Sequence, residues 1–381
     1  MRKMTASLAP LLLAPLLMAA LLASPRAVAA PSDAKAPAHA RNVILFVGDA
    51  GAMTAMMTGA TTRETSIGVD AGLERGQCDP SPAHRLASLV EQAKDAGLAA
   101  GVVTTARITL PVPASAYAHV SDRDWEVDSR MPEAALAAGC RDIARQLIEF
   151  DHHGGLDVAL GGGRLAFMSA YQADPPPPDC NRVRSDGRLA FVPAHQADPA
   201  PPDCNRVRGD GVDLIARWRS RNPTGQYVWT GPQLTDATAH DTGPLLGLFA
   251  PDGMATSGGA PSDPAAADQP SLTDMTVAAI AMLAKHPRGY VLVVHEGGIR
   301  EARYRGDAAE ALRRTNALSD AAAAAAKAAS DDTLIVVAAD RAGDAPVYAH
   351  GPGAQRLHGP LEPAALYATL RDALGLDAAQ R

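Results

Sequence analysis

The amino-acid sequence predicts an α/β protein with a central, mostly parallel β-sheet flanked by helices. Two observations support this fold class. Short apolar runs rich in β-branched residues alternate along the chain with longer segments that carry Ala, Leu and Ile at helical spacing, and this alternation is typical of βαβ units. The runs are continuously apolar, which indicates strands buried on both faces. Because ligands of such sheets bind at the carboxyl ends of the strands, functional residues are expected directly after each strand.

Five apolar runs are expected to form strands of this sheet. They are Asn42–Val47, Leu98–Thr104, Leu156–Leu160, Tyr290–His295 and Thr333–Ala338. Five further segments are expected to form the covering helices. They are Leu86–Ala96, Pro132–Glu149, Leu272–Lys285, Asp307–Ala329 and Pro363–Leu374. Ser271 is a suitable N-cap for the third of these helices, with Asp274 three residues further on.

The first 30 residues have the three-part pattern of a secretory signal peptide. Arg2 and Lys3 precede an apolar run from Leu8 to Ala23, and small residues follow at 27–30. The alternative is a membrane anchor, but the run is short for a span of about 20 residues and contains two prolines. We therefore expect a periplasmic or secreted mature chain that begins near Ala30 or Pro31, with no membrane span after cleavage.

Composition restricts the partners and the redox compartment. The formal net charge is −7, and a chain without basic clusters is not expected to bind nucleic acid, which requires Lys and Arg to neutralise phosphates. The four cysteines are Cys78, Cys140, Cys180 and Cys204. In an oxidising compartment they suggest disulfides, but spacing leaves all three pairings open, and free thiols are the alternative.

A tandem duplication occupies residues 164–211. Arg164–Gly187 reads RLAFMSAYQADPPPPDCNRVRSDG, and Arg188–Gly211 repeats it as RLAFVPAHQADPAPPDCNRVRGDG. One repeated pair is too short for a solenoid, so we expect an insert tolerated in a surface loop rather than a new binding function. Residues 250–270 are rich in Gly, Pro, Ala and Asp and are expected to form a second, flexible loop.

An ordered series of segments resembles the alkaline phosphatase family along nearly the whole mature chain. The series begins with RNVILFVGD (Arg41–Asp49) and AMTAMMTGATTRETSIGVD (Ala52–Asp70), and it ends with DDTLIVVAAD and VYAHGPGAQ. The resemblance implies a single domain over residues 31–381 with an alkaline-phosphatase-like sandwich. It also implies hydrolysis of phosphate monoesters with two zinc ions, one magnesium ion and a serine nucleophile, usually in a homodimer.

The first motif of the chain fuses two motifs of that family. In the family, Gly-Asp-Gly-Met-Gly carries a metal-binding Asp, and a later Asp-Ser-Ala carries the nucleophile. GDAGAMTAMMTG matches the first motif on its left and the second on its right. Asp49 can be the metal ligand, yet counting back from MMTG places it where the serine belongs. We therefore predict that the nucleophile is absent and assign no catalytic residue. Thr54 is the nearest hydroxyl on the following helix but matches another family position, and no serine lies nearby before Ser66.

Other ligand positions of the family also carry residue types that differ from the family's metal ligands. The magnesium motif falls on Leu110 and Val112, whose apolar side chains cannot bind a cation, while Arg123 matches the arginine that clamps phosphate. The alternative role for Arg123 is an ordinary surface ion pair. Counted without gaps through ALSDA, the Glu, Asp and His of a later motif fall on the three residues His295, Arg300 and Tyr304.

The last strand ends near one further family position. Asp340 matches a zinc-binding Asp, but Arg341 stands where the family has His, and the final zinc His has no counterpart between Asp344 and Tyr348. Asp49, Asp340 and His295 are thus the remaining metal-ligand candidates, and they fall short of the three or four donors that each zinc needs. The two arginines at former ligand positions would instead neutralise the retained aspartates or bind an anion.

The resemblance also implies that Cys78 pairs with Cys140. Its consequence for function is a protein that retains the family fold but has lost most or all of the activity, with Arg123 left to bind phosphate or a small phosphoester. Zn and Mg are the cofactors that the family implies. The alternative is an active or weakly active secreted, metal-dependent alkaline phosphatase.

Overall fold

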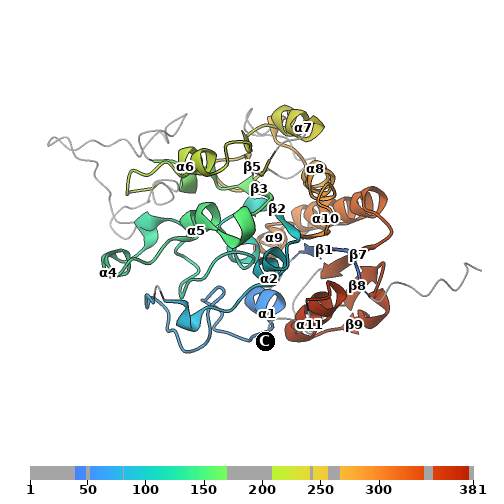
Figure 1. Cartoon of the computed structure of the whole chain (residues 1–381), viewed down its shortest axis with the longest axis horizontal. Coiled ribbons are helices and arrows are strands. Elements are labelled where there is room, and N and C mark those ends of the chain that lie inside the picture. Colours follow the sequence, from blue (N-terminus) through green and yellow to red (C-terminus); the bar gives the residue numbers. More distant parts are fainter. Residues whose placement is uncertain are drawn as a thin grey trace, which may run out of the picture. The chain divides into compact units, whose positions relative to one another are not determined.

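Strands from both halves of the chain join one mixed sheet. The computed structural model describes residues 39–48, 52–79, 81–169, 208–240, 243–255, 267–338 and 346–376, all within the unit Pro37–Arg381. Among these residues, nine strands pair in the following order (Figure 1): β4 (Gln226–Val228), β5 (Leu245–Leu248), β3 (Val158–Gly162), β2 (Ala99–Arg107), β6 (Tyr290–His295), β1 (Asn42–Val47), β7 (Thr333–Ala338), β8 (Pro346–His350) and β9 (Gly359–Pro360).

The sheet confirms the predicted fold class. In this order, every neighbouring pair from β4 through β5, β3, β2, β6 and β1 to β7 is parallel. Only the pairs β7–β8 and β8–β9, at one edge, are antiparallel. Three of the predicted runs, which form β1, β6 and β7, have the bounds expected from the sequence. The other two, β2 and β3, begin one and two residues later and extend further. Four short strands, β4, β5, β8 and β9, were not predicted.

Both faces of the sheet are buried, as the continuous apolar runs indicated. Along β1, Val43 and Leu45 belong to one apolar cluster, whereas Ile44 and Phe46 belong to another. Because side chains alternate across a strand, the two clusters lie on opposite faces. Eleven α-helices are described: α1 (Met53–Thr58), α2 (Leu89–Asp95), α3 (Pro111–Ala114), α4 (Glu133–Ala137), α5 (Ile143–Glu149), α6 (Leu214–Arg221), α7 (Gly231–Ala239), α8 (Leu272–Leu283), α9 (Ile299–Tyr304), α10 (Ala308–Ala328) and α11 (Pro363–Ala373).

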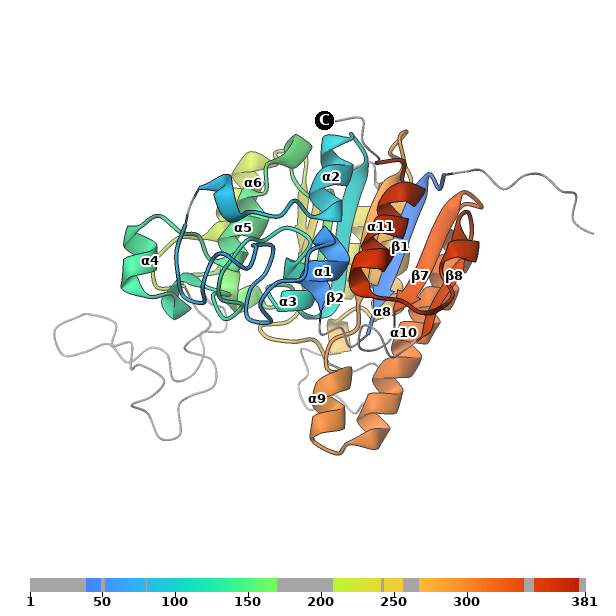
Figure 2. The same cartoon turned by 90° about the horizontal axis from the view of Figure 1, so that it is seen from below.

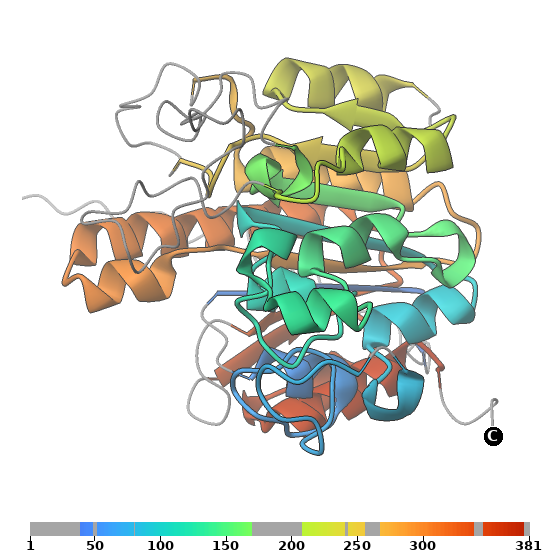
Figure 3. The ribbon, with the colours of Figure 1, turned by 90° about the vertical axis from the view of Figure 1, so that its left-hand side faces the viewer.

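The helices divide between the two faces. Buried side chains of α1, α2, α5, α6 and α11 join the first cluster, and those of α7, α8, α9 and α10 join the second. Figure 2 shows α1, α2 and α11 on one side of β1, with α9 and the start of α10 extending past the carboxyl ends of the strands; Figure 3 shows the same α9–α10 pair from the side. This projection places α9 beside the edge where ligands of parallel sheets bind.

The helices begin and end at capping residues, and two of them therefore differ from the bounds predicted from the apolar pattern. The predicted helix Leu86–Ala96 begins at Leu89, because Ser88 and Glu91 form a capping box. The predicted helix Pro132–Glu149 is divided into α4 and α5. Gly139 has a φ of +87°, which ends the first helix, and the Asp142 side chain caps the second. The expected Ser271 cap of α8 is confirmed as a capping box with Asp274.

The disulfide implied by the resemblance is present. Cys78 and Cys140 are bonded, with their Cα atoms 5.9 Å apart, and the bond ties the loop before α2 to the segment between α4 and α5. Cys180, Cys204 and most of the duplicated insert lie outside the described residues, as do the expected signal peptide and most of the loop 250–270. Among the residues that are described, no helix is long and apolar enough to cross a membrane.

Candidate functional site

A cavity of about 300 Å³ lies at the carboxyl edge of the sheet. The carboxyl-terminal parts of three central strands meet there. Val47 ends β1 and pairs in register with His295, which ends β6, and Thr104, three residues before the end of β2, pairs with His295 as well. The start of α1, the loop before Ile67, the loop that opens α3, and the β6–α9 turn complete the walls. This is the location at which parallel α/β sheets bind ligands.

Five of the positions singled out in the sequence line this one cavity, although they are far apart in the chain. They are Leu110, Val112, Arg123, His295 and Arg300. Tyr304, assigned to the same motif as His295, is not among the residues that line it, and 76% of its surface is exposed near the end of α9. Asp49, Asp340 and Arg341 lie outside the described residues; Gly48, the residue before Asp49, lines the cavity.

Arg123 is positioned by its backbone rather than by its side chain. Its N–H donates to the Thr65 carbonyl at 2.7 Å. The guanidinium makes a 3.5 Å contact with the Glu64 carbonyl oxygen and lies 3.8 Å from the Glu64 carboxylate. These contacts are long, and 38% of the Arg123 side chain is exposed. The Arg123 guanidinium therefore retains N–H groups that can donate hydrogen bonds to a ligand in the cavity.

His295 is a buried, uncharged imidazole in the cavity wall. Its Nδ1 lies 2.8 Å from the Thr104 hydroxyl, which also accepts the Ala106 N–H. Burial, with a further contribution from the positive charge of Arg300, lowers the pKa of His295 to about 3. The same positive charge opposes the approach of a dication to this histidine.

Glu296 is a functional candidate that the sequence reasoning passed over. It follows β6 directly and is only 2% exposed. Its Oε1 lies 3.1 Å from Arg314 Nη1 of α10, while Oε2 has no hydrogen-bond partner among the described residues. Burial raises the pKa of Glu296 to about 7 against the opposing charge of Arg314. Perturbed carboxylates of this kind are common at functional sites.

A signal for Glu296 was present in the sequence. The ungapped count through ALSDA placed the Glu and Asp of the family motif on His295 and Arg300. A shift of one residue places them on Glu296 and Glu301, both carboxylates. A Glu-Gly-Gly directly after an apolar strand could have indicated this register. The structure favours the shifted register for its first position, because Glu296 is the buried carboxylate at the end of β6.

The hydroxyls of the cavity come from the loop and from α1. Thr54 Oγ1 donates to the Ser66 carbonyl at 3.3 Å. Ser66 is 5% exposed, and its Oγ is buried without a hydrogen-bond partner among the described residues. Neither of these two hydroxyls is recorded in contact with His295, so neither forms with it the nucleophile–base pair that activates a serine.

The described residues do not fit two zinc ions and a magnesium ion. Nowhere in the described part of the chain do three or more His, Cys, Asp or Glu side chains gather in a group that could hold a metal. Leu110 and Val112 present apolar surface, and Arg300 adds positive charge. The orphaned oxygen of Glu296 is one suitable donor, but a zinc site needs three or four.

Comparisons with known proteins identify the family. The family model described as alkaline phosphatase matches residues 35–345. The tissue-nonspecific alkaline phosphatase of Gallus gallus is 36% identical over 275 residues, covering 71% of this chain and 48% of that protein. The alkaline phosphatase of Gadus morhua is 34% identical over 270 residues, covering 69% and 50%. The chain therefore belongs to the alkaline phosphatase family, and it spans about half the length of these relatives.

Solved structures agree on the fold. Alkaline phosphatase from the Antarctic bacterium TAB5 superposes with a TM-score of 0.62 at 18% identity, covering 89% of this chain and all of that one. The Thermus thermophilus enzyme gives 0.51 at 22% identity, covering 79% and 59%. One TAB5 variant structure holds Mg in its M3 site. Family and neighbours thus imply Zn and Mg as cofactors of this class of protein.

Proposed function

We propose that this chain is a secreted, non-catalytic member of the alkaline phosphatase family that binds phosphate or a small phosphoester in the cavity at the carboxyl edge of the sheet. The observation that carries the proposal is the character of the cavity wall. Apolar side chains occupy the predicted magnesium positions, and three arginines (Arg63, Arg123 and Arg300) line the same space together with two glutamates (Glu64 and Glu301). Guanidinium groups recognise phosphate oxygens and repel dications.

The absence of a nucleophile limits any residual chemistry. Phosphate monoester hydrolysis by this family is expected to need an activated serine and two cations that neutralise charge on the phosphate. The sequence supplies no serine at the fused motif, and the cavity donors do not suit the metals. Loss of a catalytic group that acts as part of a unit costs on the order of a millionfold in rate. The residues that remain can hold an anion without transferring its phosphoryl group.

The alternative function is a weakly active, metal-dependent phosphatase. The buried Glu296 favours it, because a carboxylate with an orphaned oxygen at the end of a central strand is a suitable magnesium ligand. Asp49 and Asp340, which follow the runs of β1 and β7 in the sequence, would be its partners. The two functions differ in metal content and turnover, so they are separable by experiment.

The decisive test measures hydrolysis of an aryl phosphate by the purified mature chain with added zinc and magnesium, beside an active family member. We expect turnover on the order of a millionfold lower than that of the active enzyme, substoichiometric zinc by elemental analysis, and calorimetric binding of inorganic phosphate. Turnover that a chelator abolishes would establish the alternative. Tight zinc without turnover would refute the predicted loss of the metal sites, and an absence of phosphate binding would refute the anion-binding role.

A further inference from the structure

The cavity loop (residues 61–67) and the segment that carries Arg123 are paired through their backbones. Ile67 and Val120 exchange two N–H···O bonds of 2.8 Å, and the Arg123 N–H donates to the Thr65 carbonyl at 2.7 Å. Apart from Thr65, every residue of this loop lines the same cavity as Arg123. The position of Arg123 therefore depends on how this pair of segments is held against the rest of the fold.

His119, the residue before Val120, connects these segments to helix α2. Its two ring nitrogens contact two different oxygens. Nδ1 lies 2.7 Å from the Gly68 carbonyl oxygen, and Nε2 lies 2.8 Å from Oε1 of Glu91. Only 8% of the His119 side chain and 7% of the Glu91 side chain are exposed. The ring therefore joins the residue that follows the cavity loop to the first turn of α2, inside the protein.

Both of these contacts require a proton on the ring nitrogen. A carbonyl oxygen and an ionised carboxylate only accept hydrogen bonds. Burial opposes the charge of Glu91, but hydrogen bonds from His119 and His152 hold the pKa of this carboxyl well below its usual range. Its other oxygen accepts the Ser88 N–H at 2.7 Å. A His119 ring that makes both contacts donates from both nitrogens, and such a ring is the positively charged imidazolium.

The other charged and titratable side chains near His119 come from several elements. They line a cavity of about 330 Å³ that the ring borders together with Glu91, and they are Asp79, His84, Arg85, Tyr117, Arg141, Glu149, Asp151 and His152. Within the described part of the chain, the recorded partners of the ring are only Gly68 and Glu91. A change in the charge of the ring therefore acts first on these two contacts.

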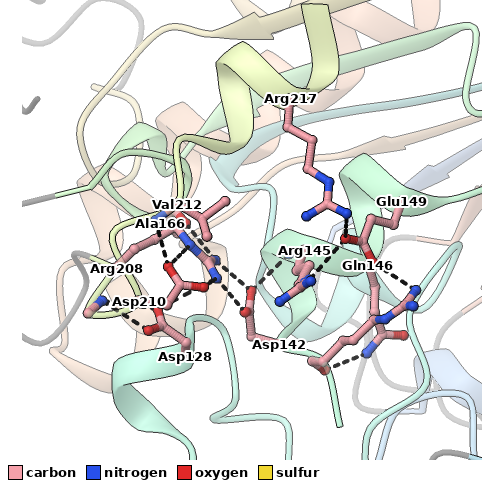
Figure 4. A network of polar contacts seen from close by, with 12 residues as sticks. Asp128, Asp142, Arg145, Gln146, Glu149, Ala166, Arg208, Asp210, Val212 and Arg217 are labelled. Atoms are coloured by element: carbon pink, nitrogen blue, oxygen red, sulfur yellow. Dashed lines mark hydrogen bonds and ion pairs between the residues drawn. The ribbon is translucent and has the colours of Figure 1, made fainter. Parts of the chain in front are cut away.

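The backbone of His119 is fixed by helix α5. The Gln146 side chain accepts the His119 N–H at 2.8 Å and donates to the His119 carbonyl at 3.3 Å. The start of α5 is fixed in turn, because its capping residue Asp142 pairs at 3.0 Å with both terminal nitrogens of the fully buried Arg208. Figure 4 shows Gln146 on this helix and Arg208 beside Asp142. With the backbone fixed, the ring contacts decide how the cavity loop is held.

Gly68 is suited to the close approach of the ring. It has a φ of +60°, a conformation that favours glycine, and a Cβ atom at this position would lie 2.8 Å from Nδ1 of His119. The Gly68 carbonyl also accepts the Leu86 N–H at 2.9 Å. If the ring releases this oxygen, one hydrogen bond to it remains. The loop can therefore loosen without leaving a buried carbonyl unpaired.

We propose that His119 is a positioning residue of the anion cavity, whose charged ring holds the cavity loop and, through it, Arg123. A neutral ring has one nitrogen without a proton, which then faces an acceptor oxygen, so the contact with either Gly68 or Glu91 is lost. The loop is held less firmly, and the affinity for an anion falls. This last consequence rests on the proposed binding of phosphate, whereas the effect on the loop does not.

Amide hydrogen exchange in the mature chain tests the effect on the loop. His119→Gln keeps a donor but removes the charge. The Ile67 and Arg123 amides should exchange at least about tenfold faster in this variant, with exchange in the central strands unchanged. His84→Gln is the matched control, because His84 lines the same 330 Å³ cavity but pairs with Asp70, at 2.9 Å. This control should leave both amides as they are in the native chain.

Two results would refute the positioning role. One is unchanged exchange of the Ile67 and Arg123 amides in His119→Gln. The other is equally faster exchange throughout the chain, which would mark His119 as a residue of general stability only. Should His119→Gln fail to fold, Gln146→Leu, which releases the His119 backbone, should make the same two amides exchange about threefold faster. No change in that variant would refute the proposal.

Calorimetry of anion binding tests the consequence for the cavity. Sulfate is the probe, because it keeps its shape and charge over the pH range in which imidazoles titrate. Sulfate affinity should fall with rising pH, and the fall should be about fivefold larger in the native chain than in His119→Gln. Titration of Glu296 contributes equally to both chains, so identical pH profiles would refute the role of the ring charge. If the native chain binds neither sulfate nor phosphate, the proposed function fails, and hydrogen exchange still decides whether His119 holds the loop.

Discussion

Two arginine sites in this molecule use the same chemical group in opposite ways. Arg208 is fully buried and donates hydrogen bonds to both carboxylate oxygens of Asp142 and to Asp210. Arg123 is 38% exposed, and its one recorded ion pair with a described residue is a long one, to the exposed Glu64. A guanidinium whose donors are all engaged inside the protein holds the chain together, whereas one that faces a cavity with donors to spare is suited to a ligand. The degree of burial thus indicates which arginine is structural and which binds.

The first prediction, with the largest expected loss of stability, concerns the carboxylate that pairs with the structural arginine Arg208. Asp142→Ala removes the bidentate partner of Arg208 and the cap of α5 together. Breaking a buried pair from one side costs about 3–5 kcal/mol because the remaining charge stays buried. Urea denaturation measures the loss.

Asp213→Ala is the matched control for this prediction. Asp213 caps α6 through the Ala216 N–H, but it is only partly buried, unlike Asp142, so its removal should cost about 1 kcal/mol. Equal losses in the two variants would show that Asp142 matters only as a cap, and the contrast between the two arginine sites would lose its energetic basis.

The second prediction concerns the buried carboxylate beside the binding cavity. Burial raises the pKa of Glu296 from 4.5 to about 7. A carboxyl group whose folded pKa exceeds its unfolded pKa contributes stability below pH 4.5, and that contribution is lost as the pH rises through 7. Glu296 should therefore reduce the stability of the native chain by up to about 3 kcal/mol between pH 4.5 and pH 8.

Glu296→Gln removes this dependence. Unfolding free energies at pH 5 and pH 8 should differ less in the variant than in the native chain, and Glu64→Gln, an exposed carboxylate of the same cavity, should leave the native difference unchanged. A native-like pH difference in Glu296→Gln would mean that the carboxylate is stabilised as an anion, as it would be if it held a bound cation.

The parts of this structure that the sequence predicts are those decided by local pattern. The runs of β1, β6 and β7 are continuously apolar, so burial on both faces could be inferred with their bounds. The strands β4 and β9 are three and two residues long, and such segments form only because a neighbouring strand offers hydrogen bonds. No periodicity in three residues distinguishes them from a loop.

The candidate site likewise contains residues that local motifs predict and residues that they do not. The ordered motifs brought Leu110, Val112, Arg123, His295 and Arg300 to one cavity. Glu296 was passed over because an ungapped count fixes positions only to within one inserted or deleted residue. Arg208 gave no signal of its own, since its importance depends on Asp128 and Asp142, which are more than 60 residues away in the chain.

The third prediction concerns the binding arginine. Arg123→Gln removes the charge while keeping two donors, and a hydrogen bond from a charged group contributes about 1.5–3 kcal/mol. Calorimetry should therefore show phosphate affinity reduced by at least about tenfold, with the thermal midpoint unchanged. Arg356→Gln is the matched control. Arg356 ends η7 (Ala354–Arg356) and is 45% exposed, and its one recorded ion pair with a described residue is a 3.6 Å contact with Asp372. An equal loss of affinity in both variants would indicate nonspecific attraction of phosphate.

The smallest expected effect comes from an ion pair of intermediate burial. His152, 32% exposed, lies 3.2 Å from Glu91 and 2.8 Å from Asp95. These carboxylates raise the pKa of His152 to about 9, with the Glu91 hydrogen bond as the main favourable cause. The resulting stability is fully present below the unfolded pKa of 6.5 and is lost as the pH rises through 9. After allowance for solvent screening, His152→Gln should remove about 1 kcal/mol of the stability difference between pH 7 and pH 10.

His240→Gln is the matched control, because the His240 side chain has only the Asp236 carbonyl among its recorded partners. This variant should leave the stability difference between pH 7 and pH 10 unchanged. If His152→Gln instead cost as much as Asp142→Ala, charge pairing rather than burial would rank these sites, and the contrast between Arg208 and Arg123 would need another cause.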